Sequence, residues 1–508
     1  MRLIAVLAGI AAIVLASCAT PSPTNGATTM TADPYLWLEE VEGERAVAWV
    51  RDQNARSLSH LEADPRFSPL LADAIAVANS GDRLPLGDIR EGYLYNFWQD
   101  ETHVRGIWRR SPLDAYARGE PRWETLLDID ALAATESANW VYKGVGCLDG
   151  HNRCMVQLSD GGRDASTFRE FDLNTRRFVD GGFVVPEAKS STTWIDIDTL
   201  LVGTDWGGGT MTESGYPFVT KRWRRGTPLA SAEEVVRGVA TDVGVYGGTL
   251  EDVDGRRVSV VVEADTFFES TFWRLDTATA ERINLPAKAT LIGLYRGYLV
   301  FTLEEAWRGL PQGALAAYPL ADTGSNAPRA VALFSPTPRQ SIESVTVTHD
   351  AILVALYDNV RGRLMRIAHD GNEWRQTQVD LPTTGSISFA GSSATDERAF
   401  AVYEDHLTPS TLYALENRAT TARAIRSLPP QFDASPYVAE QYEATSRDGT
   451  RVPYFILHRR DMPLNGQNPT LLWAYGGFQV SYPPSYSPFV GKMWLERGGV
   501  YVLANIRG

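Results

Sequence analysis

Two apolar runs near the end of the sequence each lead into residues that can do chemistry. One run, residues 470–475, ends at Tyr475 and is followed by two glycines and Phe478. The other, residues 500–505, is followed by Ile-Arg-Gly at 506–508. Runs that are apolar throughout predict strands in the middle of a sheet, buried on both faces. Tyr475 and Phe478 then lie at a strand end, where they either serve a binding site or belong to a tight turn in which the glycines supply backbone freedom.

These two strands are typical of the opening of an α/β-hydrolase sheet. Such a domain carries a nucleophilic serine on a Gly-x-Ser-x-Gly turn, and the acid and the histidine follow it in the chain. The 508 residues contain no match to that pentapeptide, and the seven histidines, at positions 60, 103, 151, 349, 369, 406 and 458, all precede residue 500. We therefore expect the Ser/Asp/His triad to be absent, so that the chain is a truncated, inactive fragment of a hydrolase.

Cysteine chemistry is the second candidate. Cys147 and Cys154 flank a turn-forming stretch that begins with Asp149-Gly150, so the two thiols can face each other across a hairpin. In an oxidising compartment this spacing predicts a disulfide. Two alternatives are a reduced, packed pair and a zinc site that recruits His151, for which no fourth ligand is evident. We expect no metal site and no cofactor.

The N-terminus has the features of an export signal. Arg2 precedes an apolar run over residues 3–16, which is too short to span a bilayer as a stable helix, and Leu-Ala-Ser-Cys ends it at Cys18. This ending resembles the bacterial lipobox, which predicts a signal peptide over residues 1–18, a lipid on Cys18 and a flexible tether over residues 19–32. The alternative is ordinary secretory cleavage near residues 16–20. We expect a periplasmic protein attached to the membrane only through this lipid anchor.

The length and the net charge of the chain limit its domain number and the partners that it can bind. A chain of 508 residues is too long for one hydrophobic core, so at least two domains are expected. Acidic side chains outnumber basic ones by 62 to 48, which gives a formal net charge of −14. Nucleic-acid binding is therefore not expected, because phosphate contacts need a concentrated basic surface.

Residues 33–84 predict a helical segment, because apolar residues of its first part recur at helical spacing, among them Trp37, Leu38, Ala46, Trp49 and Val50. The exposed apolar face would be costly in water, so the segment must dock on something large.

Residues 85–430 instead show short alternating strands separated by turn residues. A weak repeat runs through them, in which an apolar or aromatic strand ends in a charged turn. Its seven units are Gly106–Asp114, Phe168–Asp172, Phe218–Trp223, Thr271–Asp276, Leu315–Asp322, Leu364–Asp370 and Leu412–Asn417. Their spacing matches a four-stranded blade with its loops, which predicts a mainly β fold with a seven-bladed β-propeller. The alternative is an irregular pair of β-sandwiches.

The order of motifs resembles that of the prolyl oligopeptidase family of serine peptidases. The residues that carry the resemblance are Asp33-Pro-Tyr-Leu-Trp-Leu-Glu-Glu40, Trp49-Val50, Gln53-Asn54, Arg447-Asp-Gly-Thr450, Tyr475-Gly-Gly-Phe478 and Ala504-Asn-Ile-Arg-Gly508. The resemblance implies that residues 431–508 begin an α/β-hydrolase catalytic domain and that residues 33–84 pack on it.

The resemblance also implies a function. Members cleave short peptides, commonly after proline, and the propeller controls access to the catalytic groups. By the family pattern the hydroxyl of Tyr475 lies in the oxyanion hole and Phe478 lines the pocket for the residue before the scissile bond. We expect short peptides as partners and a monomer. The alternative function is a non-catalytic propeller module that binds peptides or a protein.

Overall fold

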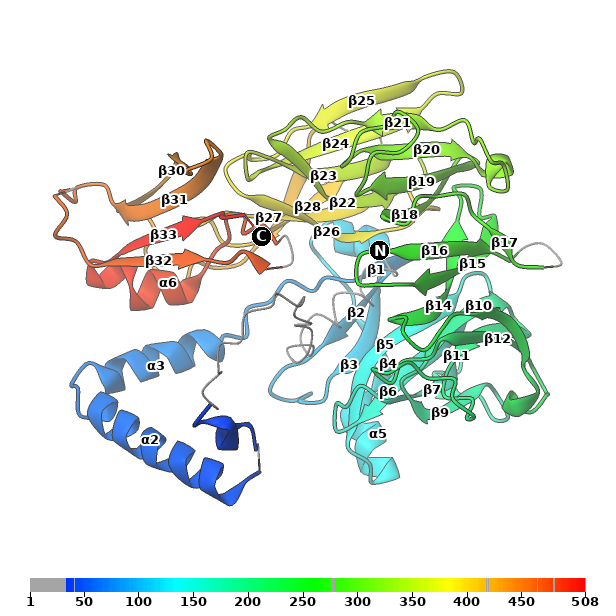
Figure 1. Cartoon of the computed structure of the whole chain (residues 1–508), viewed down its shortest axis with the longest axis horizontal. Helices are drawn as coiled ribbons and strands as arrows, with labels where there is room; N and C mark the ends of the chain where they lie inside the picture. Colours follow the sequence, from blue (N-terminus) through cyan, green and yellow to red (C-terminus); the bar gives the residue numbers. More distant parts are fainter. Residues whose placement is uncertain are drawn as a thin grey trace, which may run out of the picture.

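The computed structural model describes residues 33–40, 42–275, 279–416, 418, 420–463, 465–477 and 480–507 (Figure 1). The predicted signal peptide and tether, together with Cys18 and Phe478, lie outside these residues. In the described ranges, no helix has the length and hydropathy needed to cross a membrane.

Residues 88–427 form seven antiparallel sheets, each built from consecutive strands of the chain (Figure 1). The first contains β1 (Asp88–Arg90), β2 (Tyr93–Trp98), β3 (Ile107–Pro112) and β4 (Glu124–Asp128). The second contains β5 (Trp140–Leu148), β6 (Arg153–Asp160), β7 (Ser166–Asp172) and β8 (Arg177–Phe178), with β9 (Val184–Ala188) paired to β7. The third contains β10 (Ser191–Asp196), β11 (Thr199–Gly203), β12 (Val219–Arg224) and β13 (Glu233–Arg237).

The other four sheets repeat this plan. The fourth contains β14 (Gly244–Glu251), β15 (Arg257–Ala264), β16 (Ser270–Arg274) and β17 (Glu281–Arg282), and the fifth β18 (Ala289–Tyr295), β19 (Tyr298–Leu303), β20 (Leu315–Pro319) and β21 (Val331–Phe334). The sixth contains β22 (Gln340–Val347), β23 (Ile352–Asp358), β24 (Arg361–His369) and β25 (Trp374–Val379), and the seventh β26 (Ser386–Ser392), β27 (Ala399–Glu404), β28 (Thr411–Leu415) and β29 (Arg423–Ser427). Short helical turns connect some strands: α4 (Leu113–Ala117), α5 (Ile129–Glu136), η2 (Leu229–Ser231) and η3 (Leu320–Asp322).

The sheets pack on one another around a ring. Shared cores join neighbours, and the first sheet closes on the seventh through a cluster that includes Leu94, Tyr116 and Phe400. The Gly87 N–H also donates to the carbonyl of Ala390 at 3.3 Å across this seam. The predicted β-propeller is therefore confirmed, and the alternative of two β-sandwiches is wrong.

The repeat in the sequence marks one structural position. Its units fall on the third strand of each sheet, namely β3, β7, β12, β16, β20, β24 and β28. Each of these strands has a neighbour on both sides, so its apolar residues are buried while its end turns into a polar loop. The alternation of these strands between buried residues and polar loops produces the repeat seen in the sequence.

The N-terminal segment forms a 3₁₀ turn, η1 (Leu36–Glu39), and two helices, α2 (Glu44–Glu62) and α3 (Phe67–Ala78). The rings of Trp37 and Trp49 meet edge to face at 6.3 Å. α3 lies against α6 (Pro488–Met493), and Asp73 pairs with Arg497 at 3.0 Å. The N-terminal helices thus contact the C-terminal part of the chain.

The C-terminal part is a separate four-stranded sheet in the order β30-β31-β33-β32. Its strands are β30 (Tyr437–Thr445), β31 (Arg451–Arg459), β32 (Thr470–Ala474) and β33 (Val500–Ala504), with α6 and η5 (Leu495–Arg497) before β33. A hairpin with Asp448-Gly449 in its turn joins β30 to β31, and β32 runs parallel to β33.

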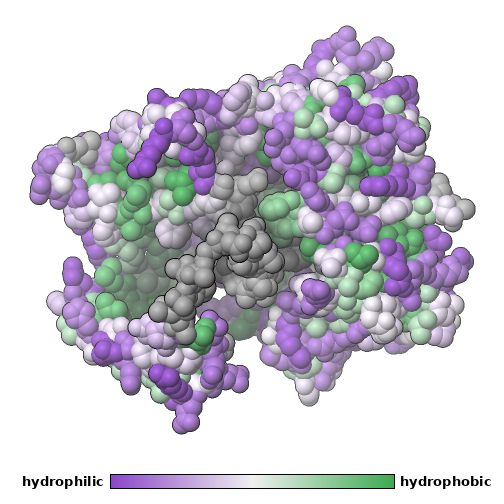
Figure 2. Space-filling model, viewed as in Figure 1, coloured by the Kyte–Doolittle hydropathy of each residue, from purple (hydrophilic) through white to green (hydrophobic). Residues whose placement is uncertain are grey.

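The expectation that both apolar strands are buried on two faces is wrong for β32. All five of its residues are exposed, with Leu472 at 65% and Trp473 at 48%. The reason is that β32 pairs only with β33, at the edge of the sheet, which leaves its side chains only partly covered. In Figure 2 hydrophobic residues gather around the hollow between this sheet and the N-terminal helices.

Candidate active site

The parallel pairing of β32 and β33 brings two chain segments to the same edge of the sheet. Ala474 pairs with Ala504 at the end of the register, so Tyr475 and Asn505 leave the sheet side by side. The carboxyl ends of parallel strands are where ligands bind in open α/β sheets. The candidate site therefore begins at this edge.

Gly476 permits the two segments to approach each other. A Cβ at this position would lie 2.6 Å from the carbonyl oxygen of Arg507, a distance that real Cβ atoms do not show. Arg507 in turn reaches the turn between β30 and β31, where it pairs with Asp448 and donates to Ser446 Oγ at 3.0 Å. The predicted motifs Arg447–Thr450, Tyr475–Gly477 and Asn505–Arg507 thus lie together.

Tyr475 presents its ring at this edge. The residue is 39% exposed, and its ring meets that of Tyr482 edge to face at 5.9 Å. A Cβ on Gly477 would lie 2.6 Å from the Tyr475 hydroxyl oxygen, so glycine leaves the space that this oxygen occupies. Phe478, the other residue predicted here, lies outside the described residues.

Asn505 fixes the loop after Tyr475, a role that sequence reasoning missed. Its Oδ1 accepts from the Tyr482 N–H at 2.8 Å, and its Nδ2 donates to the Tyr482 carbonyl at 3.1 Å. In the sequence, Asn505 was recognisable only as part of a motif. No local pattern indicates that its side chain binds Tyr482, which lies 23 positions away in the chain.

A cavity of about 170 Å³ lies in the core of the C-terminal part, beside this loop. Aromatic, hydroxyl and aliphatic residues line it, namely His406, Phe432, Leu457, Trp473, Tyr482, Ser485, Ser487, Val490, Gly491, Leu495, Tyr501 and Leu503. Burial raises the pKa of Tyr501, with a smaller contribution from Tyr482. His406 is the one lining residue that comes from the propeller.

The two paired cysteines lie elsewhere. A disulfide joins Cys147 and Cys154, which are opposite each other in the register of β5 and β6. The guanidinium of Arg90, which is 4% exposed, donates to the carbonyl of Leu148 at 2.7 Å and pairs with Asp149. The disulfide thus belongs to the joint between the first and second sheets, and the structure gives it no place in the candidate site.

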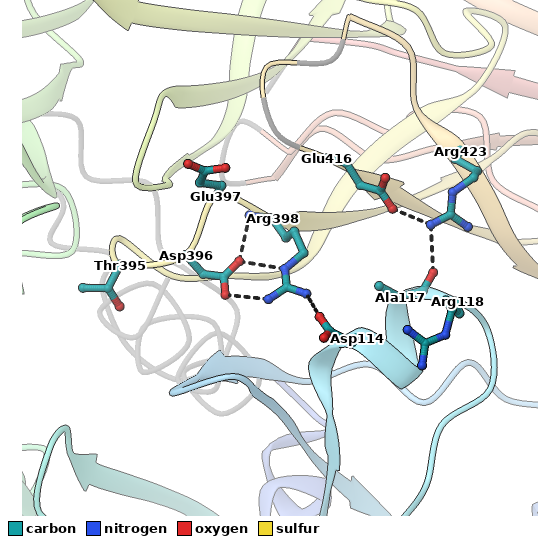
Figure 3. Close-up of a pocket in the computed structure, with 9 residues that line it drawn as sticks. All are labelled: Asp114, Ala117, Arg118, Thr395, Asp396, Glu397, Arg398, Glu416 and Arg423. Carbon is teal, nitrogen blue, oxygen red and sulfur yellow. Dashed lines mark hydrogen bonds and ion pairs between the residues drawn. The ribbon is translucent and has the colours of Figure 1, made fainter.

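A second cavity, of about 620 Å³, lies at the seam between the first and seventh sheets (Figure 3). Arg398 binds Asp396 at 2.9 Å and Asp114 at 2.5 Å, and Arg423 binds Glu416 and the carbonyl of Ala117. These contacts tie α4 of the first sheet to loops of the seventh. The cavity is lined by the propeller alone, so it is distinct from the strand ends that carry Tyr475.

Metal ligation was tested across the described ranges. They contain no group of three or more His, Cys, Asp or Glu side chains placed to hold an ion. His151, considered as a zinc ligand, is exposed in the turn between β5 and β6.

Comparison with known proteins gives the same architecture. The family model described as "Prolyl oligopeptidase, N-terminal beta-propeller domain" matches residues 21–427. A protein of Sinorhizobium fredii described as an uncharacterized peptidase, y4nA, is 38% identical over 504 residues, which cover 96% of this chain and 69% of that protein. Dipeptidyl aminopeptidase BI of Pseudoxanthomonas mexicana is also 38% identical, over 94% of this chain and 66% of that protein.

A solved structure of a related enzyme has the same fold as this chain. The post-proline cleaving enzyme from Rickettsia typhi superposes with a TM-score of 0.83 at 30% identity, over 93% of this chain and 71% of that one. Since the family model covers most of the chain and the Sinorhizobium relative aligns over more than two thirds of its own length, this chain belongs to the prolyl oligopeptidase family of serine peptidases.

Proposed function

We propose that this chain provides the propeller and the first catalytic-domain strands of an oligopeptidase that cleaves short peptides. The observation that carries the proposal is the strand-end geometry, in which Tyr475 lies exposed beside the clamped Tyr482 loop. A hydroxyl held at a sheet edge is suited to donate to the oxyanion of a tetrahedral intermediate. Phe478 would then line the pocket for the residue before the scissile bond.

The propeller would limit substrate size. Several of its loops touch the C-terminal sheet. Leu407, after β27, packs on the core of that sheet, the Asn359 carbonyl, after β23, accepts from Gln441 Nε2 at 2.7 Å, and Arg339, before β22, pairs with Glu443 at 2.6 Å. These contacts support the proposal that the propeller would cover the approach to the strand ends and so favour short, unfolded peptides over folded proteins.

The preferred peptide is part of the proposal. One relative is described as a post-proline cleaving enzyme and another as a dipeptidyl aminopeptidase. Chromogenic peptides with proline, alanine or arginine before the scissile bond, each with a free or a blocked amino terminus, would separate these specificities.

The 508 residues alone should not hydrolyse peptides. They contain no Gly-x-Ser-x-Gly pentapeptide, and without a nucleophile no acyl-enzyme forms. Incubation with a fluorophosphonate probe should leave the polypeptide unlabelled. Specific labelling that one serine substitution abolishes would overturn this part of the proposal.

The role of Tyr475 can be tested in a chimera in which residues 1–507 are joined to the part of the Sinorhizobium relative that this chain does not cover. If Tyr475 stabilises the oxyanion, Tyr475→Phe should lower kcat by about a hundredfold and leave KM nearly unchanged. Tyr442→Phe is the matched control, because Tyr442 is also exposed on the C-terminal sheet but lies on β30. Equal losses in the two variants would contradict the role.

The second candidate function is a peptide-binding or protein-binding propeller without catalysis. The observation that favours it is the closure of the propeller ring through Leu94, Tyr116 and Phe400, which does not involve the C-terminal sheet. Calorimetry with proline-containing peptides would show saturable binding to the 508-residue chain if this function holds, and none if binding needs the complete catalytic domain.

Export and lipidation complete the proposal. We propose that Cys18 becomes the lipidated first residue of a periplasmic, membrane-tethered protein. Mass analysis of the mature N-terminus tests this, since an unmodified start at Ala19 or Thr20 would show ordinary signal cleavage.

A further inference from the structure

The joint between the propeller and the C-terminal sheet contains a buried histidine. His406 lies in the connection between β27 and β28 of the seventh sheet and is only 6% exposed. Its ring meets the ring of Phe455, on β31, edge to face at 5.1 Å. The next residue, Leu407, packs on the core cluster of the C-terminal part, which includes Leu457 and Leu503. One propeller loop therefore inserts its side chains into the neighbouring sheet.

The imidazole of His406 faces the cavity of about 170 Å³ described above. The other lining residues all belong to residues 432–503, so the histidine closes the cavity from the propeller side. Its Nε2 is buried, and the described residues offer this atom no hydrogen-bond partner. A polar atom in this position is tolerated while the ring is neutral, whereas a positive charge without a partner would be costly.

The backbone of Ser485 forms a hydrogen bond with the ring, but no side chain around the ring supplies a partner for Nε2. Asp405 is its neighbour in the loop, but the Asp405 carboxylate accepts from the N–H groups of Leu407 and Thr408 at 2.9 and 2.7 Å. Glu404 accepts from Ser410 Oγ at 2.5 Å. From the C-terminal part, the facing groups are the hydroxyl-bearing Tyr482, Ser485, Ser487 and Tyr501. None of these C-terminal side chains carries a negative charge at neutral pH.

We propose that His406 is a proton-sensitive latch between the propeller and the C-terminal sheet, which holds the two together while its imidazole is neutral and releases them when the ring is protonated. The inference goes beyond the proposed function, because it concerns the assembly of the two parts and needs no peptide hydrolysis.

The direction in which pH changes docking follows from the pKa of His406 in the docked and the undocked state. Burial lowers the pKa of His406 from 6.5 to about 4, although Asp405 and the Ser485 backbone act in the opposite direction. The undocked ring therefore binds a proton more tightly than the docked one, so docking is complete above pH 6.5 and weakens as the pH falls towards 4. Over that interval the docking equilibrium should change by roughly a hundredfold or more.

Glu404 provides an internal check on the sign. Burial raises the pKa of Glu404, so its protonation strengthens the docked state as the pH falls. The two groups thus act in opposite directions. Glu443, which pairs with Arg339 across the same joint, has a lowered pKa and acts in the same direction as His406, so the His406→Phe variant is needed to assign a loss of docking in acid.

Hydrogen exchange of the full chain tests the proposal. Amide protection in β31 and β33 is measured from pH 7 to pH 4.5 and corrected for the intrinsic exchange rate, for the wild type, His406→Phe and His151→Phe. Phenylalanine keeps a ring against Phe455 and cannot be protonated, whereas His151 lies in an exposed turn of the second sheet. The wild type and His151→Phe should lose protection in acid, and His406→Phe should keep it.

Two results would overturn the latch. One is loss of protection at the same pH in His406→Phe and the wild type, and the other is a wild type that keeps full protection at pH 4.5. If His406→Phe does not dock at pH 7, titration of the His406 ring by NMR in the wild-type chain decides the question. The latch requires a midpoint well below 6.5, the ordinary value for histidine, and a midpoint near 6.5 would exclude it.

Discussion

Asn505 holds Tyr482 by both backbone groups, through hydrogen bonds of 2.8 and 3.1 Å between its side-chain amide and the Tyr482 N–H and carbonyl. The Asn505 N–H donates to the carbonyl of Pro453 at 3.0 Å, so the same residue also contacts the second strand of the sheet. One amide therefore sets the position of the loop on which the Tyr475 ring rests.

Replacing this amide should loosen the loop. In Asn505→Asp the donor to the Tyr482 carbonyl is lost and a carboxylate oxygen faces that carbonyl. We expect the free energy of unfolding of the C-terminal sheet to fall by about 1–3 kcal/mol, measured by urea denaturation. Asn468→Asp is the control, because Asn468 donates to the Pro463 carbonyl in an exposed turn. If both variants lose the same free energy of unfolding, the hydrogen bonds between Asn505 and Tyr482 stabilise the sheet no more than the hydrogen bond in an exposed turn.

Gly476 should not accept a side chain. Gly476→Ala places a Cβ 2.6 Å from the Arg507 carbonyl oxygen, so the two strand ends must separate. The expected cost is about 1–3 kcal/mol, seen as a lower melting temperature of the C-terminal part. At Gly81 a Cβ would meet nothing within 4 Å, so Gly81→Ala should leave stability unchanged or slightly raised. A neutral Gly476→Ala would contradict the close approach.

A buried carboxylate couples the second and third sheets. Glu170, whose side chain is fully buried, is bound by Arg225 through hydrogen bonds of 2.8 and 3.1 Å. Arg225→Leu should cost about 3–5 kcal/mol, because it leaves this charge without its main partner. The exposed pair of Arg237 and Glu234 is the control, and Arg237→Leu should cost much less than Arg225→Leu, because water screens an exposed pair.

A second substitution can show whether Arg225 stabilises the contact between the second and third sheets through its charge or through its packing. If the loss in Arg225→Leu arises from the uncompensated charge, adding Glu170→Gln should recover part of it in the double variant. No recovery would mean that the guanidinium acts mainly by filling space. Guanidinium chloride denaturation gives the free energy of unfolding for all the variants.

The disulfide should stabilise the second sheet by a modest amount. The loop between Cys147 and Cys154 is short, so replacing both by serine should lower the free energy of unfolding by about 2–3 kcal/mol. Thiol counting after unfolding without reductant, in a Cys18→Ser background, should find no free thiol. A count of two reactive thiols would show that the disulfide does not form in the protein in solution.

The sequence by itself determined the architecture of the propeller. Strands such as β3 and β28 lie inside their sheets and alternate between core and loop, so their residues carry a periodic signal that is readable without a structure. The Asp-Gly hairpin between β30 and β31 and the run before Tyr475 were readable for the same local reason. Turn chemistry and hydrophobic period act over a few residues.

Other features had no such local signal. The first strand of five sheets carries a register shift, for example between Tyr142 and Gly144 and between Ile342 and Ser344, and alternation alone did not mark these positions. The predicted helical segment became two helices, and the apolar strand β32 lies at an exposed edge. Pairing order decides which strand is central, and it depends on partners distant in the chain.

In the candidate site, too, some features could be read from the sequence and others depended on the tertiary structure. The types of Tyr475, Gly476 and Asn505 were fixed by the sequence, and their motifs indicated the family. Only the tertiary structure decided that Asn505 clamps Tyr482 and that His406, from a propeller loop, closes a cavity in the next sheet. These contacts join residues far apart in the chain, and the free energy that selects them arises from burial and hydrogen bonding between segments, which no local pattern records.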